Sequence, residues 1–198
     1  MNDAVPDQER GISSDVITLH KLEGAKEAKD FYKICKERLL NINRWTELCD
    51  TDATQFTLTN KFGIPKAADA QVDDHIRLGI PGPENEGGKG FDWVIIEEIG
   101  EEISENQEFC FIRVRPASNP CISSDETMHF FKDAATSTFM VKRDGDHVFA
   151  EVHGRNEIPN VEAFAIKDKV RNVLVSLGSM LGLSAIQWKL LTKGIING

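Results

Sequence analysis

The spacing of apolar and polar residues divides the chain into a helical start, an alternating middle and a helical end. Apolar side chains recur every three or four positions over residues 25–42, which predicts an amphipathic helix, and residues 43–50 extend it or form a second short helix. From residue 54 the period changes to two, which indicates strands. Residues 16–22 are a candidate first strand, and about six antiparallel strands are expected after the helix, at 54–60, 74–80, 91–99, 108–115, 136–142 and 147–153.

The strands at 136–142 and 147–153 flank the tetrapeptide RDGD, which is the clearest hairpin signal in the chain. Asp144 and Gly145 suit a type I′ turn, because that turn needs a positive φ at both central residues. The predicted register puts one set of cross-strand pairs on the core face and the other on the opposite face. The core pairs are Val141–Val148, Phe139–Ala150 and Ser137–Val152, and the opposite pairs are Lys142–His147, Met140–Phe149, Thr138–Glu151 and Thr136–His153.

The C-terminal segment, residues 160–196, carries an apolar stripe at helical spacing, and Asn160 can cap its start. Gly178 and Gly182 interrupt the stripe, and each costs about 1 kcal/mol in a helix interior. Two interpretations stay open. Either one long helix bends at the glycines, or the helix ends there and a capping box at residues 184–187 opens a second helix.

A shorter N-terminal helix, about six antiparallel strands and a long C-terminal helix predict an α+β fold. The segments FYKICKERLLNINRWTEL, DDHIRLGIPG and ATSTFMVKRDGDHVFAEVHG, with the terminal helix, span roughly residues 16–196. Their layout resembles the START-like, Bet v 1-like (SRPBCC) helix-grip superfamily, whose members include lipid and hydrophobic-ligand carriers, polyketide cyclases and hydroxylase domains. The resemblance implies a curved sheet wrapped around the C-terminal helix, with a ligand cavity between them. We expect a flexible tail at 1–15 and a single domain at 16–198.

Composition limits the classes of partner and the location that are expected for the protein. The chain has 198 residues and a formal net charge of −9, which disfavours nucleic acids and anionic membrane surfaces. No apolar run approaches the roughly 20 residues of a membrane span, and the first residues lack the layout of a signal peptide, so no membrane insertion is expected. The cysteines are scattered, which predicts free, mostly buried thiols in the cytoplasm rather than a zinc or redox site. They are Cys35, Cys49, Cys110 and Cys121.

The densest polar run is AEVHGRNEIPN, residues 150–160. A regular strand would point Glu151, His153, Arg155 and Glu157 to the same side. A glutamate could orient His153 for acid–base chemistry, and Arg155 could hold a carboxylate or a phosphate. The alternative is a solvated sheet face with cross-strand pairs.

Other motifs fail on their spacing. GGKG at 87–90 lacks a following serine or threonine, and the acidic run 97–108 lacks the order of a calcium loop. The histidines lack the spacing of metal ligands, and no G-x-S-x-G nucleophile elbow occurs. We therefore expect no metal and no cofactor.

Residues 91–96 and 109–114 are apolar on both faces, so each strand needs cover on both sides, from a homodimer or an added layer. The favoured function is binding of a small hydrophobic or amphipathic ligand in the cavity, with Arg113 or Arg155 meeting an acidic head group. One alternative is a dimeric interaction module without ligand, and another is a cyclase- or hydrolase-like enzyme that uses His153 and Glu151. The predicted ligand-binding residues are Trp93, Phe111, Arg113, Met140, Phe149, Arg155 and Trp188.

Overall fold

The computed structural model describes residues 4–49, 54–79, 91–122, 131–158 and 185–198. Seven antiparallel strands form one curved sheet in the order β1-β7-β6-β5-β4-β3-β2. The strands are β1 (Ile12–Lys21), β2 (Gln55–Thr59), β3 (His75–Gly79), β4 (Asp92–Ile103), β5 (Gln107–Pro116), β6 (Thr136–Asp144) and β7 (His147–Glu157). The helices are α1 (Ala25–Leu40), the 3₁₀ turn η1 (Ile42–Arg44), α2 (Trp45–Leu48) and a helix over residues 185–197. The predicted α+β class and antiparallel sheet are confirmed.

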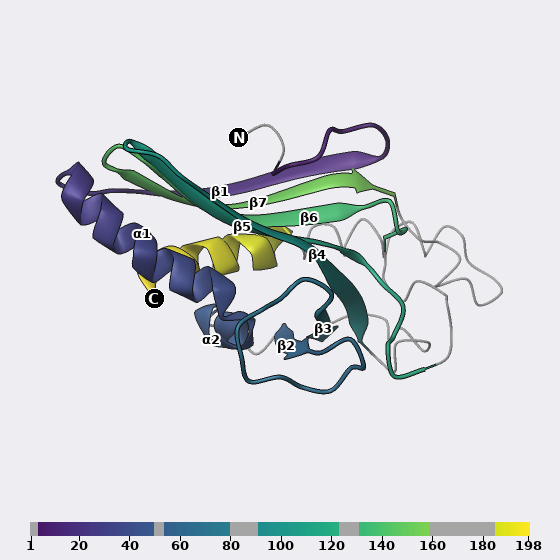
Figure 1. The fold of residues 1–198 in the computed structure, drawn as a ribbon. Helices are drawn as coiled ribbons and strands as arrows, with labels where there is room; N and C mark the ends of the chain where they lie inside the picture. Colours follow the sequence, from purple (N-terminus) through teal and green to yellow (C-terminus); the bar gives the residue numbers. More distant parts are fainter. Residues whose placement is uncertain (1–3, 50–53, 80–90, 123–130, 159–184) are drawn as a thin grey trace.

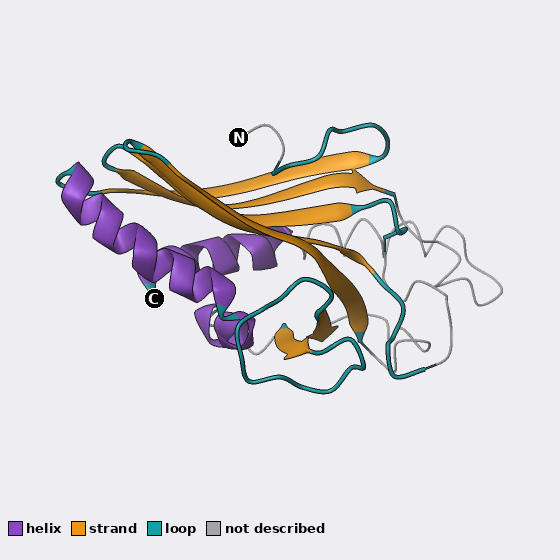
Figure 2. Ribbon diagram, viewed as in Figure 1, coloured by secondary structure: helices purple, strands orange, loops and turns teal. Residues whose placement is uncertain are grey.

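The helices lie on one side of the sheet, and the N-terminal segment lies on the other (Figure 1). β4 is long and bends, so that β2 and β3 turn down beside α2 and make the inner side of the sheet concave (Figure 2). We call the side that faces the helices the inner face and the opposite side the outer face. In the part of the chain that the structure describes, no helix is long and apolar enough to cross a membrane.

Several strands extend beyond their predicted bounds. β1 begins at Ile12, four residues before the candidate strand at 16–22. β4 continues through most of the acidic run, so the turn to β5 occupies only residues 104–106. One acidic side chain in this extension, Glu101, points to the inner face and pairs with Lys36 of α1 at 2.5 Å. The acidic run is therefore mostly strand: Glu101 pairs with a lysine of α1, and Glu97 and Glu98 pair with an arginine of β5.

The β6–β7 hairpin has the predicted faces but another register. Val141 pairs with Ala150 instead of Val148, because Gly145 and Asp146 form the turn. Only Gly145 of these two has a positive φ, at 59°. Moving the turn by one residue shifts every pair by two positions, so each side chain keeps its face. The core face of the prediction is thus confirmed, and the predicted pairs and turn are wrong.

Trp45 is the centre of the inner core. Its side chain is fully buried, and its indole N–H donates to the carbonyl of Leu39 at 3.1 Å. The ring lies 5.5 Å from Phe56 and 4.7 Å from Phe139, centroid to centroid. It therefore ties the end of α1 to both β2 and β6.

The chain's own first residues cover part of the outer face. Ala4 is buried against Phe109, Phe111 and Met140, and its carbonyl accepts hydrogen bonds from Arg113 Nη1 at 3.2 Å and Thr138 Oγ1 at 3.3 Å. The cover that β5 needs on its outer face thus comes from within the chain.

The helix over 185–197 is the described part of the predicted C-terminal helix. Residues 159–184, on which the choice between a bent helix and two helices depends, lie outside the described residues. The GGKG loop at 87–90 lies outside them as well.

Candidate functional site

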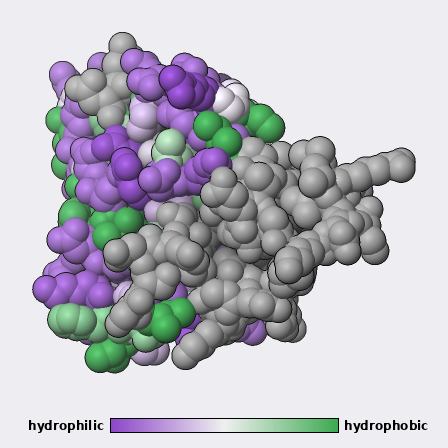
Figure 3. All heavy atoms as spheres, turned by 90° about the vertical axis from the view of Figure 1, so that its right-hand side faces the viewer, coloured by the Kyte–Doolittle hydropathy of each residue, from purple (hydrophilic) through white to green (hydrophobic). Residues whose placement is uncertain are grey.

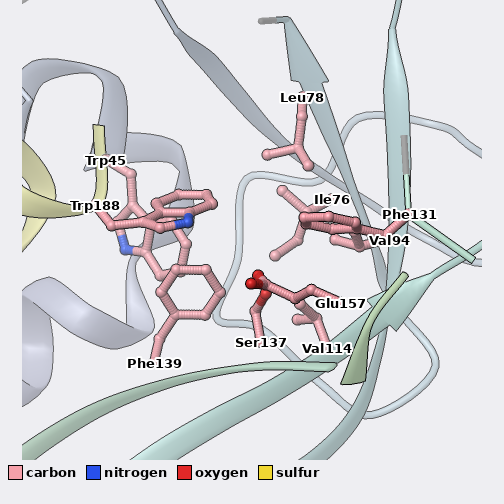
Figure 4. A pocket seen from close by; sticks show the side chains of 10 residues that line it. All are labelled: Trp45, Ile76, Leu78, Val94, Val114, Phe131, Ser137, Phe139, Glu157 and Trp188. Atoms are coloured by element: carbon pink, nitrogen blue, oxygen red, sulfur yellow. The ribbon is translucent and has the colours of Figure 1, made fainter. Parts of the chain in front are cut away.

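An apolar pocket lies on the inner face, between the sheet and the helices (Figure 4). Aromatic side chains from α2, β6 and the C-terminal helix line one side, and aliphatic side chains from β3, β4 and β5 line the other. One carboxylate reaches into it from the end of β7. The lining residues are Trp45, Ile76, Leu78, Val94, Val114, Phe131, Ser137, Phe139, Glu157 and Trp188.

Backbone geometry at the end of β7 puts Glu157 in this pocket. Asn156 has a positive φ of 56°, and the pairing of β7 with β1 shifts between Ile12 and Ser14. Such an irregularity reverses the alternation of side chains. Glu157 therefore points inward, although a regular strand would place it on the outer face with Arg155.

Gly154 makes room for that carboxylate. A Cβ atom at this position would collide with the Glu157 carboxylate and with the Ser14 hydroxyl. With no side chain there, Ser14 Oγ donates to Glu157 Oε2 at 3.3 Å. The three residues form one local arrangement at the junction of β1 and β7.

Glu157 is a buried acid in apolar surroundings. Its exposed fraction is 5%, and burial raises the pKa of its carboxyl group, although the Ser14 hydrogen bond and the charge of Arg155 act in the opposite direction. Figure 4 shows its oxygens directed into the space between Phe139 and Ile76. The pocket therefore offers one group that accepts hydrogen bonds and can carry negative charge.

The pocket is narrow as it stands. The centre of a water molecule can reach about 20 Å³ of it, and a cavity needs about 10–15 Å³ by that measure to hold one water. Any larger ligand must displace a side chain.

Of the predicted ligand-binding residues, only Trp188 lines this pocket. Phe111 and Met140 belong to the outer cluster with Ala4. Trp93 precedes Val94 of the pocket, and Phe149 lies between the core residues Val148 and Ala150, so alternation turns both outward. The sequence identified these side chains as large or charged strand residues, and the structure places them on the other face from the pocket.

The two predicted arginines also lie on the outer face, and carboxylates engage both. Arg113 Nε pairs with Glu97 at 2.6 Å, and a second nitrogen pairs with Glu98. Arg155 Nη2 pairs with Asp15 at 2.8 Å. Neither guanidinium reaches the pocket, so an acidic head group there would not meet them.

His153 and Glu151 do contact each other, but on the outer face. His153 Nε2 lies 2.7 Å from Glu151 Oε2, and Nδ1 lies 2.5 Å from Asp15 Oδ1. Burial lowers the pKa of the imidazole, and the hydrogen bonds to the two carboxylates raise it by more, so the net pKa is above the ordinary value. This arrangement favours the charged form of the imidazole between β1 and β7, and it does not face the pocket.

The cysteines behave as packed thiols. All four are free, three are buried, and only Cys121 is exposed. Burial raises the pKa of Cys110 to about 11, which makes it a poor nucleophile. No cluster of metal-ligating side chains occurs among the residues that the structure describes.

Sequence reasoning missed most of the pocket lining, Glu157 above all. The alternation of residues 150–157 predicts the wrong face for this glutamate because the shift at Asn156 has no reliable sequence signal. The aromatic lining was easier to predict: Phe139 was predicted on the core face, and Trp188 among the ligand-binding residues. The sequence did not indicate which part of the inner face leaves space for a pocket.

Seen from the right-hand side of Figure 1, the described residues that are visible are mostly hydrophilic, with small hydrophobic groups between them (Figure 3). This fits the net charge of −9.

No protein-family model matches the chain, and no curated protein matches it in sequence. Solved structures similar to it include the hypothetical protein jhp0584 from Helicobacter pylori, at 12% identity and a TM-score of 0.45, covering 91% of this chain and 84% of that one. Another is norcoclaurine synthase from Thalictrum flavum in complex with dopamine and hydroxybenzaldehyde, at 10% identity, TM-score 0.36 and coverages of 94% and 95%. A third is major latex-like protein 151 from Panax ginseng, at 10% identity, TM-score 0.39 and coverages of 90% and 97%. The chain's own topology, a curved seven-stranded antiparallel sheet with helices on its inner face, is the layout expected from the sequence.

Proposed function

We propose that the protein binds a small amphipathic ligand in the inner pocket. An apolar or aromatic part would lie among Trp45, Phe139 and Trp188, and a hydrogen-bond donor or a protonated amine would meet Glu157. The observation that carries this proposal is a buried carboxylate in a pocket whose other described lining residues, apart from Ser137, are aliphatic or aromatic.

The electrostatics of Glu157 support a donor or a cation as the ligand's polar group. Removing a charged carboxylate from water without a positively charged partner is unfavourable. Burial of Glu157 therefore raises the pKa of its carboxyl group. A ligand ammonium would restore the charged form, and it would also be attracted by the faces of neighbouring aromatic rings. The ligand charge favoured here is opposite to the one expected from Arg113 and Arg155.

The size of the pocket makes an adjustment part of the proposal. Since the open space holds about one water molecule, binding requires a lining side chain to move. Trp45 and Trp188 both line the pocket, so their fluorescence would report that movement.

A matched set of probes tests the charge preference. Benzylamine, benzyl alcohol and benzoate share a ring and differ in the polar group. Each probe is titrated into the full chain, and binding is measured by calorimetry and tryptophan fluorescence. We expect benzylamine to bind most tightly and benzoate most weakly. Benzylamine affinity should increase as pH rises through the raised pKa of Glu157, because the carboxylate then carries its charge without a proton being removed.

The variant Glu157→Gln keeps the size of the side chain and removes its charge. It should weaken benzylamine binding about tenfold, the order expected when a charged hydrogen bond of about 1.5–3 kcal/mol is weakened, and leave benzyl alcohol nearly unchanged. Glu37→Gln, on the exposed side of α1, is the matched control. Equal binding of benzoate and benzylamine, or no binding of any probe, would overturn the proposal.

We also propose a cytoplasmic location for the protein. Four free cysteines favour a reducing environment such as the cytoplasm.

A further inference from the structure

The two edges of the sheet differ in how their backbone groups are satisfied. At the β2 edge, the amide of Phe56 donates to Thr46 Oγ1 and the amide of Leu58 donates to Asn43 Oδ1, both at 3.0 Å. The carbonyl of Leu58 accepts from the amide of Lys66 at 2.9 Å. The chain therefore closes this edge with its own groups.

The β1 edge is open along the described chain. The amide of Leu22 donates to the carbonyl of Asp146 at 2.9 Å, which fixes the alternation: even-numbered residues of β1 direct their backbone groups toward β7. Odd-numbered residues, from Asp15 to Lys21, direct theirs away from the sheet. No described residue hydrogen-bonds the outward amides of Ile17 or Leu19.

The side chains of the same odd-numbered residues form a self-complementary row. Ile17 and Leu19 are 55% and 51% exposed on the outer face. An acid, Asp15, precedes this apolar pair, and a base, Lys21, follows it. An exposed edge strand with β-branched and apolar side chains is a ready template for another strand.

We propose that β1 pairs antiparallel with β1 of a second copy of this chain, about a twofold axis at Thr18. In this register Asp15, which also pairs with His153 and Arg155 of its own chain, meets the partner's Lys21. Ile17 meets the partner's Leu19, and both contacts occur twice by symmetry. All of these residues direct their backbone groups outward, so they form the hydrogen-bonded pairs of an antiparallel ladder. The two sheets then continue as one.

Neighbouring registers lack this complementarity. Centring the axis on Ile17 puts Asp15 opposite an apolar side chain, and centring it on Leu19 puts Asp15 opposite Glu23. Like charges directly opposite each other destabilise a strand pair. The charges therefore favour the axis at Thr18.

The rest of the described fold leaves this edge accessible. α1 packs on β5, β6 and β7, and the C-terminal helix lies against the inner face of β1, where Thr18 Oγ1 and Thr192 Oγ1 are 2.8 Å apart. The N-terminal segment runs over the outer face, where the Asn156 side chain accepts from the amide of Glu9 at 2.8 Å and donates to the carbonyl of Asp7 at 3.1 Å. None of these described elements hydrogen-bonds the outward backbone groups of Ile17 or Leu19.

Sedimentation velocity and light scattering of the full chain test the dimer. We expect a species of about 44 kDa, twice the 22.1 kDa chain. Ile17→Lys should raise the dimer dissociation constant about tenfold or more, because it puts two cations into the centre of the strand pair. Ile34→Lys alters an isoleucine on α1 that is 46% exposed, and it should leave the dimer intact.

A cysteine crosslink tests the register. In a Cys121→Ser background, Thr18→Cys puts two thiols opposite each other at the twofold axis, within the Cα separation of about 4.4–6.8 Å that a disulfide needs. Leu19→Cys in the same background faces Ile17 of the partner and should not crosslink. Circular dichroism confirms that each variant is folded.

The outcomes separate cleanly. A dimer that Ile17→Lys disrupts and Thr18→Cys crosslinks supports the proposal. A protein that stays monomeric up to about 100 µM, a concentration at which even weak specific dimers form, overturns the proposal. A dimer that Ile17→Lys leaves unchanged overturns it as well. Neither result depends on ligand binding at Glu157, so this proposal and the proposed function fail independently.

Discussion

Glu151 and Glu157 lie six positions apart in one strand, yet they have opposite environments. Glu151 shares a hydrogen bond with His153 on the outer face, whereas Glu157 lies in the apolar pocket with a raised pKa. Asn156 causes this difference, because its positive φ reverses the alternation of side chains just before Glu157. The chemistry available to a glutamate here depends on one backbone angle.

His153 gives a prediction for the dependence of stability on pH. Its pKa is above the ordinary value in the folded protein, so the folded state binds this proton more tightly than the unfolded state. Its stabilising contribution is complete below the unfolded pKa, about 6.5, and is lost as pH rises through the folded pKa. The free energy of unfolding, measured by urea denaturation across this range, should fall with pH.

His153→Gln should flatten that pH dependence, since glutamine does not titrate. His20→Gln is the control, because it alters an exposed histidine of the same β1–β7 pair of strands. If the wild type and His153→Gln lost stability equally between pH 6.5 and the folded pKa, the two hydrogen bonds to the imidazole would not stabilise the charged form.

At the scale of elements, the C-terminal helix approaches α2 so closely that a glycine is required. A Cβ atom at Gly194 would collide with the carbonyl group of Leu48. Gly194→Ala should therefore lower the free energy of unfolding by about 1–3 kcal/mol, as overpacking does. Chemical denaturation measures this loss.

Gly24→Ala is the matched control, because a Cβ atom there has no neighbour within 4 Å and its φ of −172° suits any residue. We expect its stability to be unchanged or slightly higher. Equal effects of the two substitutions would mean that the contact with Leu48 does not limit the packing of the helix.

Periodicity predicted the elements well because it depends on which face of each element is buried. The helix over 25–40, the two long central strands and the core face of the β6–β7 hairpin all follow from it. The exact pairing in that hairpin did not, because a turn moved by one residue preserves every face. The placement of Glu157 did not either, because one backbone irregularity outweighs the regular alternation.

The candidate site was predicted less well than the fold. Strand alternation assigns side chains to two faces, but it does not show where the inner face leaves open space. The first residues were equally hard to place. Their few apolar side chains suggest a tail, yet Ala4 completes the outer cluster with Phe109 and Phe111.

At the scale of the whole molecule, this N-terminal cover gives a further prediction. Deleting residues 1–10 would expose Phe109, Phe111 and Met140, and burying one large apolar side chain is worth about 1.5–3 kcal/mol. We expect a loss of about 2 kcal/mol and increased binding of a hydrophobic dye. Calorimetry and dye fluorescence measure the two effects.

Glu9→Ala in the full chain is the control, since Glu9 is exposed and leaves the cover in place. A deletion variant as stable as the wild type, with no added dye fluorescence, would show that residues 4 and 5 do not protect the outer cluster.

The pairing of β1 with β7 also has a consequence for synthesis. Ile12 pairs with Glu157, so β1, which is synthesised before the other described strands, cannot pair until β7 has been synthesised. Closing such a distant contact carries a large entropic cost, and it slows folding. On the ribosome α1 can form early, while the apolar side chains of β1 stay unpaired until nearly the whole sheet has emerged. β1 is therefore the strand that stays exposed to aggregation longest, and a chaperone that engages β1 would protect it during synthesis.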